Sequence, residues 1–379
     1  MSKVLVVGAG PVGAAFALLA ARHGMVCELV DARNGPATES RTLALSHGSR
    51  EILERAGAWS AALPATPILT IHTSQQGHFG RALLCAADAE VPALGYVVSY
   101  AALQAALDAA LLRAGLCVHF GARVEQIEQD ADAVQLEFSV GGATRRLSAD
   151  ALVLADGGAN LARVPELVSS EKDYGQVALL AHLVGDQPHG QRAFERFTAE
   201  GPAALLPMGQ GGEWSMVWVS GPARIDELKA LPDAQFLEQF QRHFGNRAGM
   251  FRSVASRRAF PLKLRQVAPR AKGRIAVIGN AAQALHPVAG QGFNLGLRDA
   301  RELSARLAGH RAADALAAFA QARARDVTMS IAFTDFLVGA FSNDLRPLGL
   351  ARGAALSALD ALPWARRLLA RRMVFGGAR

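Results

Sequence analysis

Three glycines near the start of the chain constrain the fold more than any other feature. Gly8, Gly10 and Gly13 fit the pattern G-x-G-x-x-G, which follows the apolar run 4–7 and precedes a helical pattern from about Pro11 to His23. At such a junction the first glycine makes the turn, the second lets a diphosphate approach the backbone, and the third lets helix and strand pack closely. The motif predicts a β-α-β unit that binds a dinucleotide.

The next strand supports this prediction. The run Val26 to Asp31 ends in a carboxylate, at the position where an acidic side chain accepts hydrogen bonds from the ribose of an adenosine. The glycine loop and Asp31 suit NAD as well as FAD. They therefore predict a nucleotide site without selecting the cofactor.

Length and composition exclude several other classes of protein. The 379 residues are 51% hydrophobic, which allows a sizeable core. No apolar run approaches the roughly 20 residues needed to cross a bilayer. The net charge of +7 favours anionic surfaces, but the basic residues are not interleaved with stacking aromatics, so no nucleic-acid partner is expected.

The cysteines and the N-terminus indicate the compartment. Cys27, Cys85 and Cys117 are odd in number and lack metal-ligand spacing, so we expect three buried or half-buried thiols, a reducing environment and no metal site. The first strand begins at Lys3, which leaves no room for a signal peptide. These features favour a cytoplasmic protein, with peripheral contact at the inner face of the membrane as a further option.

The order of patterns along the chain predicts a cofactor domain that is interrupted and resumed. Alternating stretches such as 177–184 and 214–219 predict an antiparallel sheet with which 68–84 pairs. Nucleotide-type sequence returns at 273–280, and a helical pattern follows Asp299. We expect an α/β (mixed α+β) chain with a cofactor domain at 1–66, 96–165 and 268–335, a substrate domain at 67–95 and 166–267, and a helical C-terminal segment at 336–379.

Two later segments select FAD. Asp156 and Gly157 follow the strand-like run 151–154, and residues 279–299 read GNAAQALHPVAGQGFNLGLRD. These segments resemble the D-G and G-D motifs of the class A flavin monooxygenases, the second of which usually reads G-D-A-A-H-x-x-x-P-x-x-G-Q-G-x-N. The resemblance implies a Rossmann-like FAD-binding domain of the p-hydroxybenzoate hydroxylase type. NAD(P)H is expected as a transient reductant, since no second glycine motif is present.

The resemblance also implies which residues bind the cofactor. Asn280 follows a buried strand and can reach ribose or ribityl hydroxyls, while Gly290 and Gly292 leave room for backbone N–H groups at the isoalloxazine ring. A helix beginning near Phe293 directs its positive end to that ring. Arg41 resembles the arginine that meets the phosphate region in this family. The remaining expected cofactor contacts are Gly8, Gly10, Pro11, Val12, Gly13, Asp31, Gln104, Val124, Asp156, Gly157, Gly279, Pro287, Gln291 and Asn294.

A catalytic base is harder to assign. His286 is the best ionisable candidate near the flavin, although a histidine that only shapes the loop is an equally good interpretation. Pro287 is expected beside the ring. The implied mechanism is flavin reduction, reaction with O2 to a C4a-hydroperoxide, and attack by an activated phenol ring. Trp214 and Trp218 share one strand face, as core or as wall of the substrate pocket.

Within this family, the chain resembles the ubiquinone-biosynthesis hydroxylases over nearly its whole length. Asn280 and Gln283 are similar to the 2-polyprenyl-6-methoxyphenol hydroxylase branch, whereas sister enzymes usually have Asp and His there. Asn160 replaces a serine of the D-G motif and Ala162 replaces a valine, so altered detail is expected there. The implied substrates are a polyprenylated phenol and O2, with other ubiquinone-biosynthesis proteins as partners.

The end of the chain and the choice of substrate leave alternatives open. Residues 364–373 predict a basic, apolar helix that contacts the membrane, packs on the flavin domain or forms an oligomer interface. A hydroxylase of a soluble aromatic compound and a non-catalytic flavoprotein subunit of a biosynthetic assembly are the competing functions.

Overall fold

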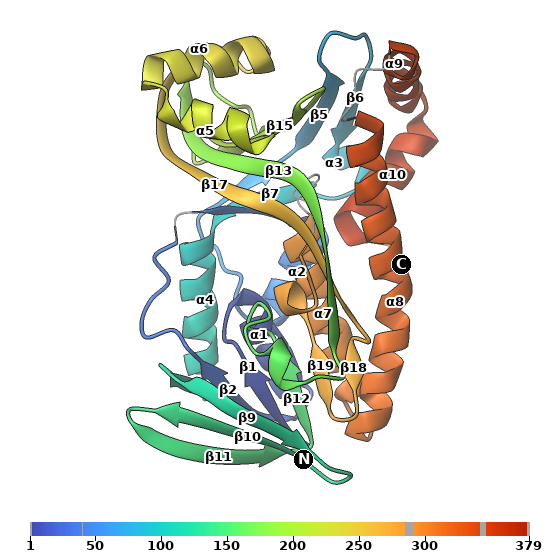
Figure 1. Cartoon of the computed structure of the whole chain (residues 1–379). Coiled ribbons are helices and arrows are strands. Elements are labelled where there is room, and N and C mark those ends of the chain that lie inside the picture. Colours follow the sequence, from blue (N-terminus) through green and yellow to red (C-terminus); the bar gives the residue numbers. More distant parts are fainter. Residues whose placement is uncertain (1, 40, 285–290, 342–345, 377–379) are drawn as a thin grey trace.

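A six-stranded sheet forms the base of the molecule. The computed structural model describes residues 2–39, 41–284, 291–341 and 346–376. The six strands are parallel to their neighbours except at β18, which pairs antiparallel with β19 (Figure 1). In spatial order they are β18 (Ala271–Lys272), β19 (Ile275–Val277), β12 (Ala151–Leu154), β1 (Lys3–Val7), β2 (Val26–Asp31) and β8 (Cys117–Phe120).

The two faces of this sheet are covered by different elements. Val4 and Val6 pack against helices, whereas Leu5 and Val7 pack against a three-stranded antiparallel sheet, because successive side chains of a strand point to opposite faces. This double burial explains the all-apolar sequence of β1. The helices are α1 (Pro11–Arg22), α4 (Tyr100–Arg113) and α7 (Gln291–Leu307), and the strands are β9 (Arg123–Gln129), β10 (Val134–Val140) and β11 (Ala143–Ala149).

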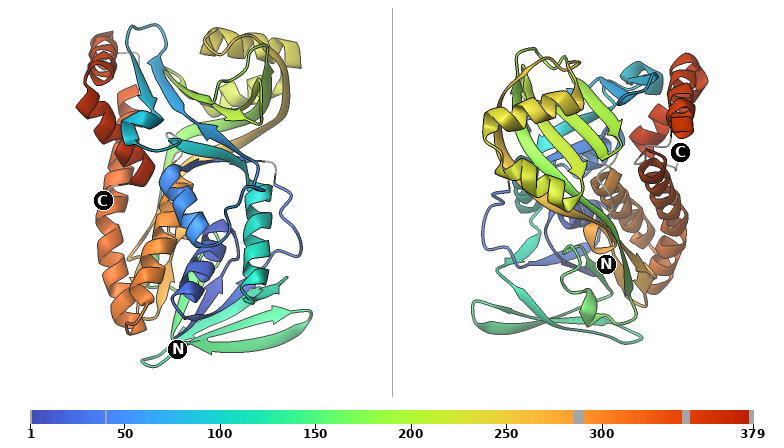
Figure 2. Two further views of the ribbon diagram at one scale, coloured as in Figure 1. Left: turned by 180° about the vertical axis from the view of Figure 1, so that it is seen from behind. Right: turned by 45° about the horizontal axis from the view of Figure 1, so that its top comes forward.

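An eight-stranded sheet lies above the six-stranded one (Figures 1 and 2). Its two longest strands, β13 and β17, extend down to the cofactor region. The predicted stretch 68–84 joins it through β5 and β6. β5 pairs parallel to β14, whereas the other strand pairs of this sheet are antiparallel, as expected. The two strands are not hairpin neighbours, so no tight turn fixes their direction. The strands are β20 (Gln283–Ala284), β17 (Phe251–Ala268), β13 (Val168–Gly185), β16 (Glu213–Ser220), β15 (Gly201–Met208), β14 (Arg192–Thr198), β5 (Thr70–Gln75) and β6 (Arg81–Cys85).

Two helices that the sequence patterns did not predict cover one face of the eight-stranded sheet. Trp214 and Trp218 are 1% and 0% exposed. Trp218 packs against Phe236 and Phe240 of α6, and Trp214 packs against Phe194 of β14 in the same core cluster. They are therefore core residues, as one of the two interpretations had it. The helices are α5 (Pro222–Ala230) and α6 (Asp233–Phe244).

A small sheet and a group of short elements connect the two large sheets. β3 and β4 both pair with β7, which carries Tyr96 to Val98. The elements are β3 (Thr42–Ser46), α2 (His47–Arg55), β4 (Ala65–Ile68), α3 (Ala86–Ala89), β7 (Gly95–Ser99) and the 3-10 turns η1 (Leu161–Arg163) and η2 (Gly279–Ala281).

Helices complete the chain, as the sequence patterns indicate. They are α8 (Ala312–Phe341), α9 (Arg346–Ala361) and α10 (Pro363–Phe375). α10 packs on α3 and β6 through Ala370 and Val374 (Figure 2). Within the described residues, no helix is both long and apolar enough to cross a membrane.

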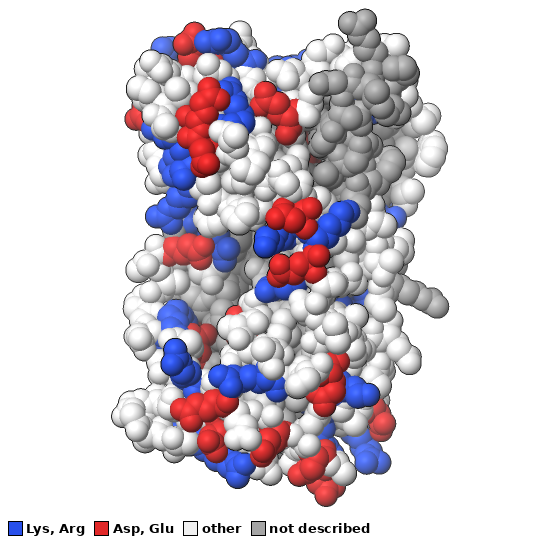
Figure 3. Space-filling view, in the orientation of Figure 1, with Lys and Arg blue, Asp and Glu red and all other residues white. Residues whose placement is uncertain are grey.

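The cysteines and the surface charge refine two expectations. Cys27 is buried, which raises the pKa of its thiol to about 12, and Cys85 is half-buried. Cys117 is exposed, contrary to the expectation, because β8 is the edge strand of its sheet. On the face shown in Figure 3, basic and acidic side chains are interspersed, so the net charge does not gather there in one basic patch.

Candidate cofactor and active site

A cavity of about 700 Å³ opens at the carboxyl ends of β1, β2 and β12. This is the edge at which parallel sheets with alternating helices bind nucleotides. Many of the residues predicted for the cofactor meet here although they lie far apart in sequence. The lining includes Gly8, Gly10, Pro11, Val12, Asp31, Arg41, Val124, Asp156, Gly157, Asn280 and Phe293.

The glycine loop has the geometry that its spacing implies. Gly8 has a φ of +99°, and a Cβ atom there would lie 2.7 Å from backbone atoms of Ala155. A Cβ at Gly13 would lie 2.0 Å from the carbonyl oxygen of Gly8, so helix and strand touch at this point. At Gly10, among the described residues, a Cβ would have one neighbour within 4 Å, the Tyr100 hydroxyl at 4.0 Å. It would point into the cavity that Gly10 lines.

The start of α1 fits a diphosphate. Gly10 is the N-cap residue and supplies no side-chain hydrogen bond, while Pro11 begins the helix. The first N–H groups of a helix lack partners within it and carry a partial positive charge. Arg41, Arg123 and Arg163 also line the cavity and add cationic groups. This chemistry matches the two phosphates of FAD.

Asp31 and Gln104 hold the loop from below. The Asp31 carboxylate accepts hydrogen bonds from the backbone N–H groups of Ala9 and, at 2.7 Å, Arg33. Gln104 is 1% exposed and donates from Nε2 to the carbonyl of Ala9 at 2.9 Å and to Asp108 at 2.8 Å. Gln104 therefore supports the loop from behind and does not line the cavity.

Arg41 stacks on an aromatic ring at the edge of the cavity. Its guanidinium carbon lies 4.4 Å from the ring centroid of Tyr100, the first residue of α4. Burial raises the pKa of the Tyr100 hydroxyl, so this side chain is neutral near pH 7. The cationic group at this helix start thus comes from Arg41.

The D-G segment forms a turn closed by its own side chains. Asp156 accepts hydrogen bonds from the backbone N–H of Gly158 at 2.9 Å and from both nitrogens of Asn160, at 2.9 and 2.7 Å. Asn160 therefore provides a side-chain donor to Asp156. The expected difference in detail from the serine of the motif stays a prediction. Ala162 lies exposed in η1.

The sequence patterns missed several residues at this site, among them Arg123 and Arg163 of the cavity wall and also Arg265. Arg265 of β17 donates from Nη2 to the carbonyl of Gly157 at 2.5 Å and to the carbonyl of Asn280 at 2.6 Å. It thus joins the D-G loop, the G-D loop and the eight-stranded sheet. No motif marks Arg265, since a basic residue in an alternating strand most often lies on a solvated face.

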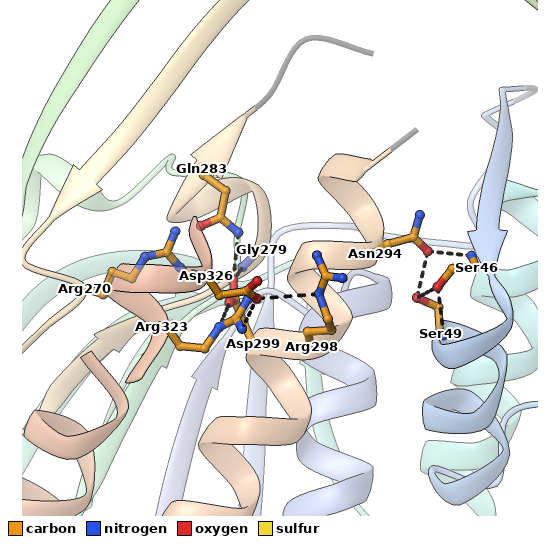
Figure 4. Close-up of polar contacts among 10 residues, drawn as sticks. All are labelled: Ser46, Ser49, Arg270, Gly279, Gln283, Asn294, Arg298, Asp299, Arg323 and Asp326. Carbon is orange, nitrogen blue, oxygen red and sulfur yellow. Dashed lines mark hydrogen bonds and ion pairs between the residues drawn. The ribbon is translucent and has the colours of Figure 1, made fainter. Parts of the chain in front are cut away.

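The G-D segment divides between the cavity and the interior. Asn280 and Phe293 line the cavity. Asn294 is 4% exposed and turns inward, where its Oδ1 accepts from the N–H of Ser46 at 2.8 Å and from the Ser49 hydroxyl at 2.7 Å (Figure 4). Its direct contacts thus hold α7 against β3 and α2.

Behind this segment lies a cluster of buried charges centred on Asp299, which is fully buried (Figure 4). Its carboxylate accepts from Gln283 Nε2 at 2.8 Å, Arg323 Nε at 2.7 Å, and Arg270 Nη1 and the Gly279 N–H, both at 3.3 Å. Gln283, part of the variant that distinguishes this chain, therefore anchors the G-D loop from inside.

The cluster continues to α8. Arg323 also pairs with Asp326, whose carboxylate lies 3.8 Å from Nε of Arg298. Burial lowers the pKa of Arg270 and Arg298. At Arg323 the effect of burial is outweighed by Asp299 and Asp326, which hold the pKa above its ordinary value.

The flavin-ring end of the predicted site is described only in part. His286, Pro287 and Gly290 lie outside the described residues. Gln291 and Gly292 begin α7, two residues before the expected start at Phe293. A second cavity of about 20 Å³ lies beyond Arg41, between β3 and the eight-stranded sheet, and no motif marks its polar side chains, which include Thr42, His182, Ser215, Ser256 and Arg258.

Comparisons with known proteins agree with this geometry. A family model described as FAD binding domain matches residues 1–333. Ubiquinone hydroxylase UbiL of Rhodospirillum rubrum is 31% identical over 98% of this chain and 89% of its own length. The 3-demethoxyubiquinol 3-hydroxylase of Escherichia coli is 30% identical over 95% of each chain.

Solved structures share the fold. The p-nitrophenol 4-monooxygenase PnpA from Pseudomonas putida matches with a TM-score of 0.80 over 100% of both chains, at 18% identity. Klebsiella pneumoniae HpxO complexed with FAD matches with a TM-score of 0.73 over 94% of this chain and 95% of that chain, at 20% identity. The expected p-hydroxybenzoate hydroxylase type of fold is confirmed.

The glycine cradle, the cationic cavity wall and the family match together identify the cofactor as FAD, with NAD(P)H the reductant typical of this class. The two relatives cover nearly the whole chain. The chain belongs to the FAD-dependent monooxygenases of the ubiquinone hydroxylase family.

Proposed function

We propose that this protein hydroxylates the aromatic ring of a polyprenylated phenol in ubiquinone biosynthesis, with FAD, NAD(P)H and O2. The observation that carries the proposal is the identity of about 30% to ubiquinone hydroxylases along nearly the full chain. Asn280 and Gln283 favour the 2-polyprenyl-6-methoxyphenol hydroxylase branch.

The chain's own residues bind and orient the cofactor. When bound, FAD takes reducing equivalents from NAD(P)H and delivers one oxygen atom of O2 to the aromatic ring. Asp31, Arg41 and Arg163 line the cavity. Asp31 would hold the adenosine ribose, and the two arginines would neutralise the diphosphate together with the start of α1. His286 remains the candidate ionisable group and Pro287 the candidate neighbour of the ring.

An apolar cavity of about 70 Å³ supports a substrate with a hydrocarbon tail. It lies between β3, the β5–β6 hairpin and α10, with Asn294 at its α7 side. No charged residue lines it in the part of the chain that the structure describes. The lining is Ala44, Leu45, Ser46, Ile68, Ile71, Leu84, Leu94, Gly95, Asn294, Ala370, Met373 and Val374.

The size of this cavity implies a movement of α10. Pockets that enclose small organic ligands usually measure about 300 Å³ or more, several times the space found here. We therefore propose that α10 shifts outward to admit the tail.

The outer face of α10 fits contact with a membrane. Trp364 and Leu368 are 66% and 65% exposed, next to Arg367, Arg371 and Arg372 on the same helix. Exposed aromatic and aliphatic side chains among basic ones favour binding to anionic lipid. A prenylated substrate would then enter from the bilayer.

Oxygen consumption distinguishes the candidate functions. Prenylated and unprenylated phenols are compared in NADPH-dependent O2 uptake, with the hydroxylated product measured by mass spectrometry. Coupled turnover with the prenylated phenol alone supports the proposal. Equal turnover of both indicates a hydroxylase of soluble aromatics, and bound FAD that NAD(P)H cannot reduce with any phenol indicates a non-catalytic subunit.

Filling the apolar cavity tests the tail site. Met373→Trp should raise KM for the prenylated phenol about tenfold and leave KM for a short phenol unchanged, because the bulk lies only in the tail path. Leu112→Trp, at an exposed position of α4 outside the cavity lining, is the matched control and should change neither value. Equal effects of Met373→Trp on both substrates would contradict a tail site.

Membrane contact is tested without removing the helix, because α10 contributes to the core through Ala370 and Val374. The double variant Trp364→Ser, Leu368→Ser should lose co-sedimentation with liposomes that contain anionic lipid. Co-sedimentation equal to that of the unaltered protein would contradict the proposed contact.

A further inference from the structure

Three side chains of different chemistry meet at the open edge of the six-stranded sheet, away from the elements that surround the apolar cavity. Cys117 and His119 are two residues apart in β8, so both point to the same side of the strand. Glu28 of β2 is the register partner of Cys117 in the parallel pair. The fold thus gathers a thiol, an imidazole and a carboxylate that are separated in sequence.

The three groups converge on one point. Nε2 of His119 lies 2.8 Å from Oε1 of Glu28 and 3.7 Å from Sγ of Cys117. One ligand atom from each of the three residues lies within 4.8 Å of the other two. A relay that activates a thiol would use the two different nitrogens of the imidazole. Here the carboxylate and the sulfur face the same nitrogen, which is the arrangement of ligands around a shared centre.

The two distances from Nε2 of His119 can be compared with those within a tetrahedral zinc site. With Zn–S near 2.3 Å and Zn–N near 2.0 Å, tetrahedral angles place sulfur and nitrogen about 3.5 Å apart. The 3.7 Å found between Cys117 and His119 is close to this value. Nitrogen and carboxylate oxygen need about 3.4 Å, so Glu28 has to withdraw by roughly half an ångström. Such a movement is small for a half-buried glutamate side chain.

We propose that Glu28, Cys117 and His119 form a binding site for Zn²⁺, with water as the fourth ligand. The mixed sulfur, nitrogen and oxygen set suits Zn²⁺ and its spectroscopic substitute Co²⁺ better than it suits Mg²⁺ or Ca²⁺, which prefer oxygen alone. The cysteines lack ligand spacing among themselves, so the sequence alone predicts no metal site. The site is independent of the proposed hydroxylase function.

Two neighbouring side chains, Phe138 and Lys3, contact the cluster. The ring of Phe138 lies 5.2 Å from that of His119 and covers one side of it. Nζ of Lys3 lies 3.1 Å from the second carboxylate oxygen of Glu28 and competes with a metal for this group. The Lys3 ammonium therefore competes with a bound cation for Glu28, and removing its charge should strengthen metal binding.

A metal here would fasten the edge strand to the sheet. β8 leads directly into Ala122, Arg123 and Val124, which line the FAD cavity. A ligand that binds only the folded state stabilises it in proportion to its concentration over Kd. Added Zn²⁺ should therefore raise Tm of the FAD-loaded protein, and the rise should depend on Cys117.

Equilibrium dialysis of the FAD-loaded full chain against buffered Zn²⁺, with metal content measured by mass spectrometry, tests the site. One Zn²⁺ per chain is expected. Cys117→Ser and His119→Gln should each weaken binding at least about tenfold, since each removes one of three protein ligands. His78→Gln removes an exposed histidine elsewhere and should bind as the unaltered protein does.

Lys3→Ala provides a second test. If Glu28, His119 and Lys3 only form surface ion pairs and bind no metal, this variant should not bind Zn²⁺ more tightly. If the cluster binds the metal, the Zn²⁺ affinity of Lys3→Ala should rise severalfold, and Co²⁺ should show tetrahedral thiolate absorption bands that Cys117→Ser abolishes. Unchanged zinc content in both Cys117→Ser and His119→Gln, or weaker binding by Lys3→Ala, would overturn the proposal.

Discussion

The six-stranded and eight-stranded sheets differ in how their sites are built. At the six-stranded sheet the backbone itself shapes the cavity, through glycines and the free start of α1. At the eight-stranded sheet the described cavities are bounded by side chains that follow no motif, such as His182, Ser215 and Arg258. Backbone geometry needs particular residues at fixed spacing, whereas a wall of side chains accepts many sequences. This difference explains why sequence motifs identify the cofactor but mark no residue that binds the phenol.

The largest expected effect separates two glycines of the same loop. Gly13→Ala should destabilise the protein by about 4 kcal/mol or more, because its Cβ would lie 2.0 Å from a backbone oxygen that cannot move alone. Gly10→Ala should retain stability and weaken FAD binding, because its Cβ enters the cavity. Urea unfolding and FAD titration measure the two quantities. Equal loss of stability in both variants would contradict the division of roles.

The next effect concerns the buried charges behind the G-D segment. Asp299→Asn should cost about 3 kcal/mol, because Arg270 and Arg323 lose the carboxylate that compensates them in the interior. Glu302→Gln is the control, since its pair with Arg306 is partly exposed and 2.7 Å long, and should cost less than about 0.5 kcal/mol. The comparison fails if the two variants have similar Tm values.

Acid should affect the eight-stranded sheet through two buried histidines. Burial lowers the pKa of His72 in β5 and of His243 in α6 to about 4, below the ordinary 6.5, with Arg247 adding to the effect at His72 and Arg196 at His243. Both are neutral in the folded state, so their contribution is complete above pH 6.5 and is lost as the pH falls towards 4. The free energy of unfolding should then fall by up to about 1.4 kcal/mol per pH unit for each histidine.

Replacement of one histidine tests this sign. In His243→Asn the free energy of unfolding should decrease less steeply between pH 6.5 and 4 than in the unaltered protein. His78→Gln, which changes an exposed histidine, should leave the slope as it is. An unaltered slope in His243→Asn would show that acid acts elsewhere.

The smallest effect lies where the two sheets meet. Arg265→Gln should weaken FAD binding about fivefold, or about 1 kcal/mol, because the Gly157 and Asn280 carbonyls lose their shared donor. Lys263→Gln on the same strand, whose pair with Glu171 is exposed, should not change FAD affinity. An equal FAD Kd for Arg265→Gln and the unaltered protein would show that the loops keep their shape without β17.

Local patterns predicted those parts that depend on local backbone geometry. The glycine loop, the helix from Pro11 and the strand ending at Asp31 all form where expected, because the spacing of apolar residues and glycines acts within one element. The patterns missed α5 and α6, and they contain no signal for the parallel pairing of β5 with β14. Strand direction between distant segments depends on the path of the whole chain.

The sequence by itself thus determined the cofactor class, since the motifs for a diphosphate and a flavin are contiguous and require specific residues. Only the tertiary structure decided where the side chains of those motifs point. Asn280 faces the cavity, whereas Gln283 and Asn294 bond inward to Asp299 and Ser46. Such directions are fixed by packing between elements that meet only when the chain is folded. The same packing between distant elements brings Arg265 to both loops, so no local sequence pattern marks it as a site residue.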